Sequence, residues 1–209
     1  MRIYIKGDYI KEIPFDYMEL AKRMWFDTKD GKTVDISYFG NTRPFKTDPT
    51  IHLKLNKWMH DNRWNNVQLK EGIINKFGSH VYENLELDFE DNPATDYREK
   101  GDCLRLASTH FDLLTVDKRA MYIMAIEIAT AIDGQISEDD KESWLSVEEF
   151  KNRHEDILSM SYEEANELSL EEISFMDHVR DPVWEEDDRR NEEYIKIHGE
   201  PVYDDEEGE

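Results

Sequence analysis

One segment of the chain, residues 116–132, is apolar around most of its circumference and therefore limits the folds that are possible. Its least charged part, residues 120–132, still contains Glu127 and is too short to cross a bilayer as a helix. A helix that is apolar on most sides has to be covered by the rest of the protein. We therefore expect a central, buried helix from Val116 to Ile132.

The residues before this helix are typical of a small mixed α/β part. Alternating apolar residues predict strands at residues 2–6, 34–39 and 81–89. Helical spacing predicts helices at residues 15–26 and 68–77, and another that begins at Pro49 and carries Leu53, Leu55 and Trp58.

Residues 93–199 are expected to form an acidic, mainly helical part, which gives an α+β fold overall. The spacing of Leu104, Ala107, Phe111 and Leu114 predicts a helix over residues 103–114. A serine followed three residues later by a glutamate predicts a capped helix start, and this pattern occurs at Ser146/Glu149, Ser161/Glu164 and Ser169/Glu172. A last helix is expected from Pro182 to His198, and residues 200–209 are expected to be a disordered acidic tail.

The charge of the chain is divided unequally along its length. Residues 1–79 hold 14 Lys and Arg against 10 Asp and Glu, whereas residues 80–209 hold 12 against 39, within a formal net charge of −23. The change lies close to Pro93 and suggests two domains, residues 1–92 and 93–199. So negative a chain is a poor ligand for free nucleic acid or for an anionic membrane, which leaves basic proteins as the expected partners.

Cysteine content and the N-terminal residues indicate where such a protein works. Cys103 is the only cysteine, so an internal disulfide is impossible and a reducing compartment fits best. The first ten residues lack the apolar stretch of a signal peptide. We expect a soluble, cytoplasmic protein.

The motifs that would indicate catalysis or metal binding are weak. Gly134 has the setting of an EF-hand glycine, but the loop would need ligands at Ala129 and Ala131, so a helix C-terminal turn is expected. Cys103 and His110 would lie on one helix face among apolar residues, as core residues do. Since no phosphate loop, nucleophile motif or zinc motif is present, we expect no enzyme, cofactor or metal site.

A group of basic and aromatic residues in the first part could form a nucleic-acid-binding patch. Its members are Lys54, Lys57, Trp58, Arg63, Trp64 and Lys70. Surface lysines beside core tryptophans explain it better. A weaker alternative is that the patch docks on the protein's own acidic part or on a second copy, which leaves a homodimer possible.

Carboxylates in the second part form the strongest pattern. In the last helix Asp181, Glu185, Asp188 and Glu192 fall within a 60° sector of the helical wheel, opposite Val183, Tyr194 and Ile197, which are expected to anchor the helix as a thin apolar face. Like charges at this spacing weaken a helix, so a column of them suggests a binding surface. The predicted partner-binding residues are Asp181, Glu185, Glu186, Asp188, Glu192, Glu193, Glu163, Glu164, Glu167, Glu171, Glu172, Glu138, Asp139 and Asp140.

In composition, and in segments such as residues 184–188 and 204–207, the chain resembles the small acidic inhibitors of bacteriophages. These are nucleic-acid mimics that block restriction or CRISPR enzymes. The resemblance implies a stoichiometric inhibitor that occupies the basic nucleic-acid- or guide-binding surface of a host nuclease complex. The first alternative is an immunity or antitoxin-like protein that neutralises a basic toxin, and the second is an enzyme or metal-dependent protein that uses a carboxylate cluster.

Overall fold

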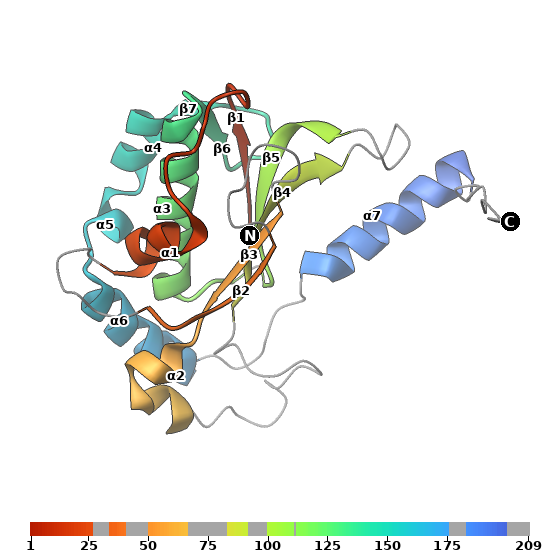
Figure 1. Ribbon diagram of the computed structural model, residues 1–209. Coiled ribbons are helices and arrows are strands. Elements are labelled where there is room, and N and C mark those ends of the chain that lie inside the picture. The colour runs from red at the N-terminus through yellow and green to blue at the C-terminus, as the bar shows by residue number, and fades with distance from the viewer. Residues whose placement is uncertain are drawn as a thin grey trace, which may run out of the picture.

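A seven-stranded antiparallel sheet forms the frame of the protein in the computed structural model, in the order β2-β3-β4-β5-β1-β6-β7 (Figure 1). The structure describes residues 1–26, 34–40, 50–66, 83–91, 100–110, 112–175 and 183–199. The strands are β1 (Arg2–Lys6), β2 (Ile36–Gly40), β3 (Ile51–Leu55), β4 (Leu85–Asp91), β5 (Lys100–Ser108), β6 (Gln135–Ser137) and β7 (Leu145–Ser146).

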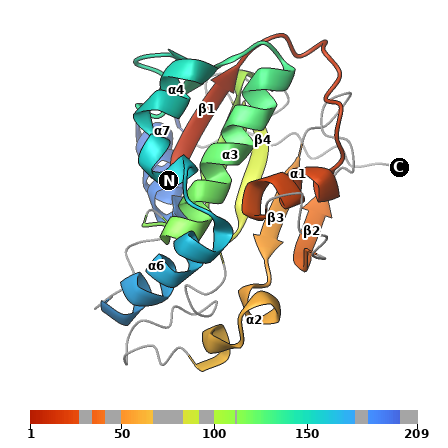
Figure 2. The ribbon, with the colours of Figure 1, turned by 90° about the vertical axis from the view of Figure 1, so that its left-hand side faces the viewer.

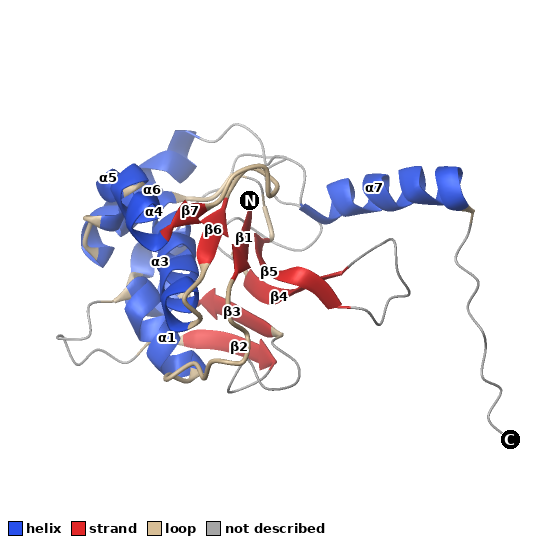
Figure 3. Cartoon of the chain, turned by 90° about the horizontal axis from the view of Figure 1, so that it is seen from above, coloured by secondary structure: helices blue, strands red, loops and turns tan. Residues whose placement is uncertain are grey.

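Helices cover one face of this sheet, and a last helix stands on the other side (Figure 3). The described helices are α1 (Tyr17–Trp25), α2 (Lys57–His60), the 3-10 helix η1 (Asn62–Asn66), α3 (Thr115–Ala131), α4 (Val147–Arg153), α5 (Glu155–Leu158), α6 (Tyr162–Phe175) and α7 (Val183–His198), of which α7 is the one on the other side. Figure 2 shows α3 running along the sheet, with α6 and α2 near its lower end. The fold is therefore mixed α+β.

The main core lies between the sheet and α3. Ile3 pairs with Leu106, and Ile5 lies between Leu104 and Ile136 in the ladders of its two neighbouring strands; all five side chains are fully buried. Eleven residues of α3 are buried, so the predicted central helix is confirmed almost to its ends. Among the described residues, no helix combines the length and the apolar character needed to cross a membrane.

The first turn of α3 is capped by residues from α6. Leu114 is at the N-cap position and has no side chain that could accept a hydrogen bond from the exposed amides. Instead, the Val116 amide donates to Ser169 Oγ at 2.8 Å, and the Thr115 amide donates to a Glu172 carboxylate oxygen at 2.8 Å. The carboxylate also places negative charge at the positive end of the helix dipole.

The contacts of Ser169 and Glu172 with α3 show that the predicted helix start at these two residues is wrong. Ser169/Glu172 does not start a helix, because both residues lie inside the continuous helix α6. The pair does act as a cap, but for α3 rather than for its own helix. The other two capping boxes, at Ser146/Glu149 and Ser161/Glu164, are confirmed by reciprocal hydrogen bonds.

Two further segments predicted as helices are strands. Residues 100–108 form β5, in which Cys103, Leu104 and Leu106 are all buried, so that burial on both faces imitated helical spacing. Residues 51–55 form β3, where Ile51, Leu53 and Leu55 are buried and alternate with partly exposed residues. The prediction for residues 68–77 and that for the tail, residues 200–209, fall outside the described residues.

The remaining local predictions agree with the structure. The strands expected at residues 2–6 and 34–39 are β1 and β2, that at 81–89 overlaps β4, and the helices expected at 15–26 and 182–198 are α1 and α7. Residues 133–134 form the C-terminal turn of α3: Asp133 has φ 49°, and the Gly134 amide donates to Ala129 O. A Cβ at Gly134 would lie 2.6 Å from Lys6 O, so the close approach requires glycine.

The change of charge near residue 92 does not coincide with a break in the sheet. Strand β4 ends at Asp91 and pairs directly with β5, which begins at Lys100. The largest apolar core also contains residues from both sides of this point, from Ile3 to Ala165. The near-neutral and acidic parts of the chain therefore share one sheet and one core.

Removal of the Ser169 hydroxyl tests the capping of α3 by α6. Ser169→Ala leaves the buried Val116 amide without its acceptor, so the free energy of unfolding should fall by about 1–3 kcal/mol. Urea denaturation measures the change. Ser174→Ala on the same helix removes only an exposed hydroxyl and should change stability by less than about 0.5 kcal/mol. Equal effects of the two substitutions would contradict the capping role.

Candidate functional site

The predicted acidic residues in the turn between β6 and β7 mainly hold the turn itself. Glu138 Oε2 lies 2.8 Å from His154 Nε2, and Asp139 accepts hydrogen bonds from Ser137 and Ser143. The Ser143 hydroxyl and amide lower the pKa of Asp139 to about 2. Asp140 accepts a hydrogen bond from the Tyr4 hydroxyl at 3.0 Å. All three carboxylates are engaged within the protein, and Asp139 and Asp140 are also exposed.

The predicted acids of α6 divide between two faces of the helix. Glu172 points to the N-terminus of α3, whereas Glu163, Glu164, Glu167 and Glu171 are exposed. The exposed acids, together with Leu168 and Leu170, form one open surface along the helix. We call these six residues the α6 outer face. Hydrogen bonds from Ser161 and from Arg63 lower the pKa of Glu164 and of Glu167, respectively, so both carboxylates are ionised at neutral pH.

The opposite side of α6 is fixed by buried polar contacts. The Trp64 indole N–H donates to Asn166 Oδ1 at 2.8 Å, and Asn166 donates to Asp61 at 2.8 Å. Trp64 and Asn166 are 3% and 4% exposed. Together with the contacts of Ser169 and Glu172 to α3, these bonds hold the helix along its length. The α6 outer face is therefore a preformed surface.

A buried ion pair joins α2 to the first turn of α3. Lys57 Nζ lies 2.6 Å from Asp117 Oδ2, and both side chains are 1% exposed. Among the described residues, neither Asp117 oxygen accepts a well-aligned hydrogen bond, so the Lys57 ammonium is its main compensation. Burial raises the pKa of Asp117 to about 6, although Lys57 opposes the shift; Glu83 and Glu172 add to it.

A second buried pair lies at the same end of the molecule. His110 Nδ1 is 2.9 Å from Glu83 Oε2, and the His110 amide donates to the other oxygen of Glu83 at 3.1 Å. Both side chains are 3% exposed. His110 and Cys103 were expected to be core residues, and their burial is confirmed, but they belong to strand β5 and the residues after it rather than to a helix.

The basic and aromatic patch expected around Lys57 binds the protein's own acidic part. Lys57 pairs with Asp117, Arg63 bonds to Glu167, and Trp64 bonds to Asn166. The favoured interpretation, surface lysines beside core tryptophans, is confirmed for Trp64 and wrong for Lys57, which is buried. Lys57 and Arg63 instead follow the weaker alternative, docking on acids of the same chain. Lys70 lies outside the described residues.

The structure describes the side chains of only two of the predicted acids of α7, Glu192 and Glu193. Asp181 lies outside the described residues, as do the side chains of Glu185, Glu186 and Asp188. Glu192 and Glu193 are exposed, and Glu192 lies 3.9 Å from Lys196 one turn away. The helix projects from the body (Figures 1 and 3), and the expected anchoring residue Ile197 is 75% exposed. For Ile197, therefore, the prediction of an apolar anchoring face is wrong.

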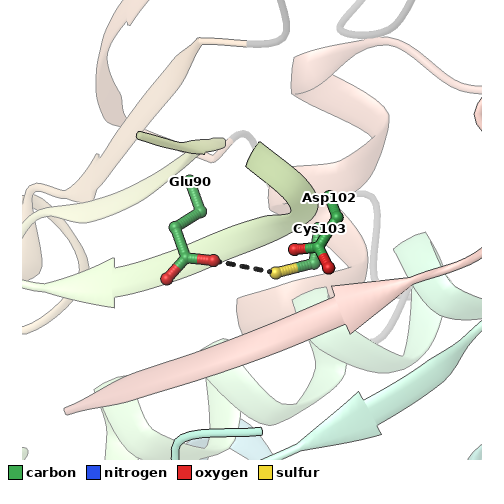
Figure 4. A group of neighbouring side chains, drawn as sticks. All are labelled: Glu90, Asp102 and Cys103. Carbon is green, nitrogen blue, oxygen red and sulfur yellow. Dashed lines mark hydrogen bonds between the residues drawn. The ribbon is translucent and has the colours of Figure 1, made fainter. Parts of the chain in front are cut away.

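One cluster offers three donors to a metal ion, Glu90, Asp102 and Cys103 (Figure 4). The thiol is 3.2 Å from Glu90, and burial, followed by that carboxylate, raises the pKa of Cys103 to about 12. A metal binds the thiolate, so burial of the Cys103 thiol opposes the loss of the proton that binding requires. Lys141 Nζ also lies 2.7 Å from both Glu90 oxygens and already neutralises them. The cluster does not favour the metal-dependent alternative.

Sequence reasoning missed the residues that position α6. Lys57 and Asp117 are 60 positions apart, and Trp64 and Asn166 are 102 apart, so no local spacing connects them. The sequence does not single out Asp117, because α3 also carries Lys118, Arg119 and Glu127. Once it is buried, its carboxylate needs a partner.

Breaking the Lys57–Asp117 pair from one side should be far more harmful than replacing both residues. Lys57→Met leaves a buried, uncompensated carboxylate and should lower the free energy of unfolding by about 3–5 kcal/mol. The double variant Lys57→Met/Asp117→Leu removes both charges and should regain most of this loss. Denaturation of both variants at pH 7 measures the difference. A double variant no more stable than the single one would contradict the pairing.

The raised pKa of Asp117 has a defined effect on stability. Its folded-state pKa of about 6 exceeds the ordinary value of 3.8, so its contribution is complete below pH 4 and is lost as pH rises through 6. Between pH 7 and pH 4, wild-type stability should rise relative to that of Asp117→Asn by on the order of 3 kcal/mol. Unfolding curves at several pH values measure this difference, and parallel pH profiles would contradict it.

Comparison with known proteins brings no relative to set beside this site. No family model, no curated protein and no solved structure matches the chain. What the protein does is therefore inferred from its own residues.

Proposed function

We propose that the protein is a non-enzymatic inhibitor that binds a basic nucleic-acid- or guide-binding surface of a host nuclease or defence complex. The observation that carries this proposal is the α6 outer face, where four exposed carboxylates lie side by side between Leu170 at one edge and Leu168 at the other. Glu163, Glu167 and Glu171 follow one another at steps of four residues, which places them about 6 Å apart along the helix axis.

The anchoring of α6 supports a binding role. A column of like charges weakens the helix that carries it, by roughly 0.2–0.5 kcal/mol for each pair four residues apart. Here the helix is held from its other side by Asn166, Ser169 and Glu172, which offsets that cost. A surface that is already ordered loses little entropy when it binds, and this favours affinity.

The electrostatics of the whole chain support the same partner chemistry. A formal net charge of −23 steers basic proteins toward the molecule and repels nucleic acid and anionic membranes. Leu168, 37% exposed, adds apolar contact at the edge of the surface. Acids beside an exposed apolar side chain fit a protein partner better than they fit an isolated cation.

A basic toxin, such as a ribonuclease, is the second candidate partner. The compact size of the surface favours this antitoxin-like role: Glu163 and Glu171 are separated by about 12 Å along the axis, much less than the length of a nucleic-acid groove. The identity of the captured partner separates the two roles.

The test is charge reversal on α6. A tagged protein should retain a basic nucleic-acid-binding protein from a host lysate at low salt and release it at high salt. The variant Glu163→Lys/Glu167→Lys/Glu171→Lys should weaken binding of the purified partner by more than about tenfold. Titration calorimetry measures the affinity, and circular dichroism checks that the fold is intact.

Two matched variants complete this test. Glu142→Lys/Glu148→Lys/Glu155→Lys makes the same change of charge at exposed positions away from α6 and should bind nearly as well as wild type. Reversal of Asp181, Glu185, Asp188 and Glu192 asks whether α7 contributes. If the α6 variant binds like wild type while the α7 variant does not, the contact surface is α7 and the assignment to α6 is wrong.

A further inference from the structure

An arginine of the protein itself lies against the α6 outer face. Arg63, in η1, donates from Nη1 to Glu167 Oε2 at 2.9 Å and from Nη2 to Glu167 Oε1, so one guanidinium spans both oxygens of the carboxylate. On its other side the Nε of Arg63 is 3.0 Å from each oxygen of Asp61. Arg63 therefore connects Asp61 with the middle carboxylate of the surface.

The two halves of this bridge differ in strength. Asp61 is 13% exposed and also accepts hydrogen bonds from the Arg63 amide and from Asn166, so it is held in place. Glu167 is 62% exposed and Arg63 is 51% exposed, and ion pairs at such exposure contribute little to stability. The contact between Arg63 and Glu167 can therefore open while Arg63 remains bound to Asp61.

We propose that Arg63 is a built-in competitor for Glu167, and that an arginine of the partner displaces it when the α6 outer face is occupied. This inference rests on the proposed function, because it concerns how the same surface is regulated. The internal contact neutralises the central carboxylate and lowers affinity for basic surfaces that lack a suitably placed arginine. The Arg63–Glu167 contact thereby makes the α6 outer face selective for partners that carry an arginine at this point.

The geometry specifies the chemistry of the displacing group. Both Glu167 oxygens accept hydrogen bonds from a single planar guanidinium, an arrangement that another arginine reproduces and a lysine ammonium does not. An arginine of the partner would replace the two hydrogen bonds from Arg63 to Glu167 with two equivalent ones. A lysine would have to break the same two hydrogen bonds and would form a weaker contact in their place. Partners rich in arginine should therefore be preferred over equally charged partners rich in lysine.

The experiment compares octa-arginine and octa-lysine peptides as probes, with affinity measured by fluorescence anisotropy. Arg63→Gln removes the competitor and should bind octa-arginine roughly two- to fivefold more tightly than wild type, the range set by an exposed ion pair. Wild type should prefer octa-arginine to octa-lysine. Since Arg63→Gln leaves Glu167 open to either cation, the variant should show a smaller preference.

The control is Arg153→Gln, which removes the same charge from an arginine that is also 51% exposed and pairs with Glu138. Its affinity for octa-arginine should rise by less than about 1.5-fold, because its charge is screened from α6. Adding Glu167→Gln to Arg63→Gln should abolish the gain, which assigns the gain to this carboxylate. The guanidinium is half exposed, so the substitution should leave the fold unchanged, and circular dichroism checks this.

The outcomes separate this inference from the proposed function. If wild type binds octa-arginine and reversal of Glu163, Glu167 and Glu171 abolishes binding, the α6 outer face is a cation-binding surface whatever Arg63 does. If Arg63→Gln then binds no more tightly than Arg153→Gln, the competitor role is overturned while the surface remains. If neither wild type nor Arg63→Gln binds either peptide, both proposals are overturned.

Discussion

The N-terminus of α3 is the point on which the rest of the structure depends. Because Leu114 cannot cap the helix, the amides of its first turn need acceptors from elsewhere, and Ser169 and Glu172 of α6 supply them. Asp117, one turn into the same helix, requires a buried cation and receives Lys57 from α2. One helix end thus fixes two elements that no sheet hydrogen bond holds.

This constraint divides the carboxylates of the protein into two groups. Some carboxylates, such as Glu172 and Asp139, accept hydrogen bonds within the protein that complete helix ends and turns. Others, such as Glu163 and Glu171, have side chains exposed at the surface. A large negative net charge therefore does not by itself define a binding surface. Only carboxylates that the fold leaves exposed can contribute to one.

The same division explains what could be predicted from the sequence. Helix α1, which buries one face, and the apolar helix α3 were predictable, because burial there follows a local period. Strand β5 was not, since Cys103, Leu104 and Leu106 are buried on both faces and conceal the period of two. The acids of α6 were predicted, but the arginine that neutralises one of them is 104 residues away, beyond the reach of any local pattern.

The charge asymmetry along the chain does not separate two bodies, because the near-neutral part and the acidic part share one sheet. Two basic residues of the first part, Lys57 and Arg63, lie on acids of the second part; one of these pairs is buried, and the other is exposed and exchangeable. Burial makes the difference: a buried ion pair cannot be opened without exposing an uncompensated charge, whereas an exposed pair can be exchanged at little cost. The near-neutral part therefore holds α6 in place through Trp64 and places Arg63 against its outer face.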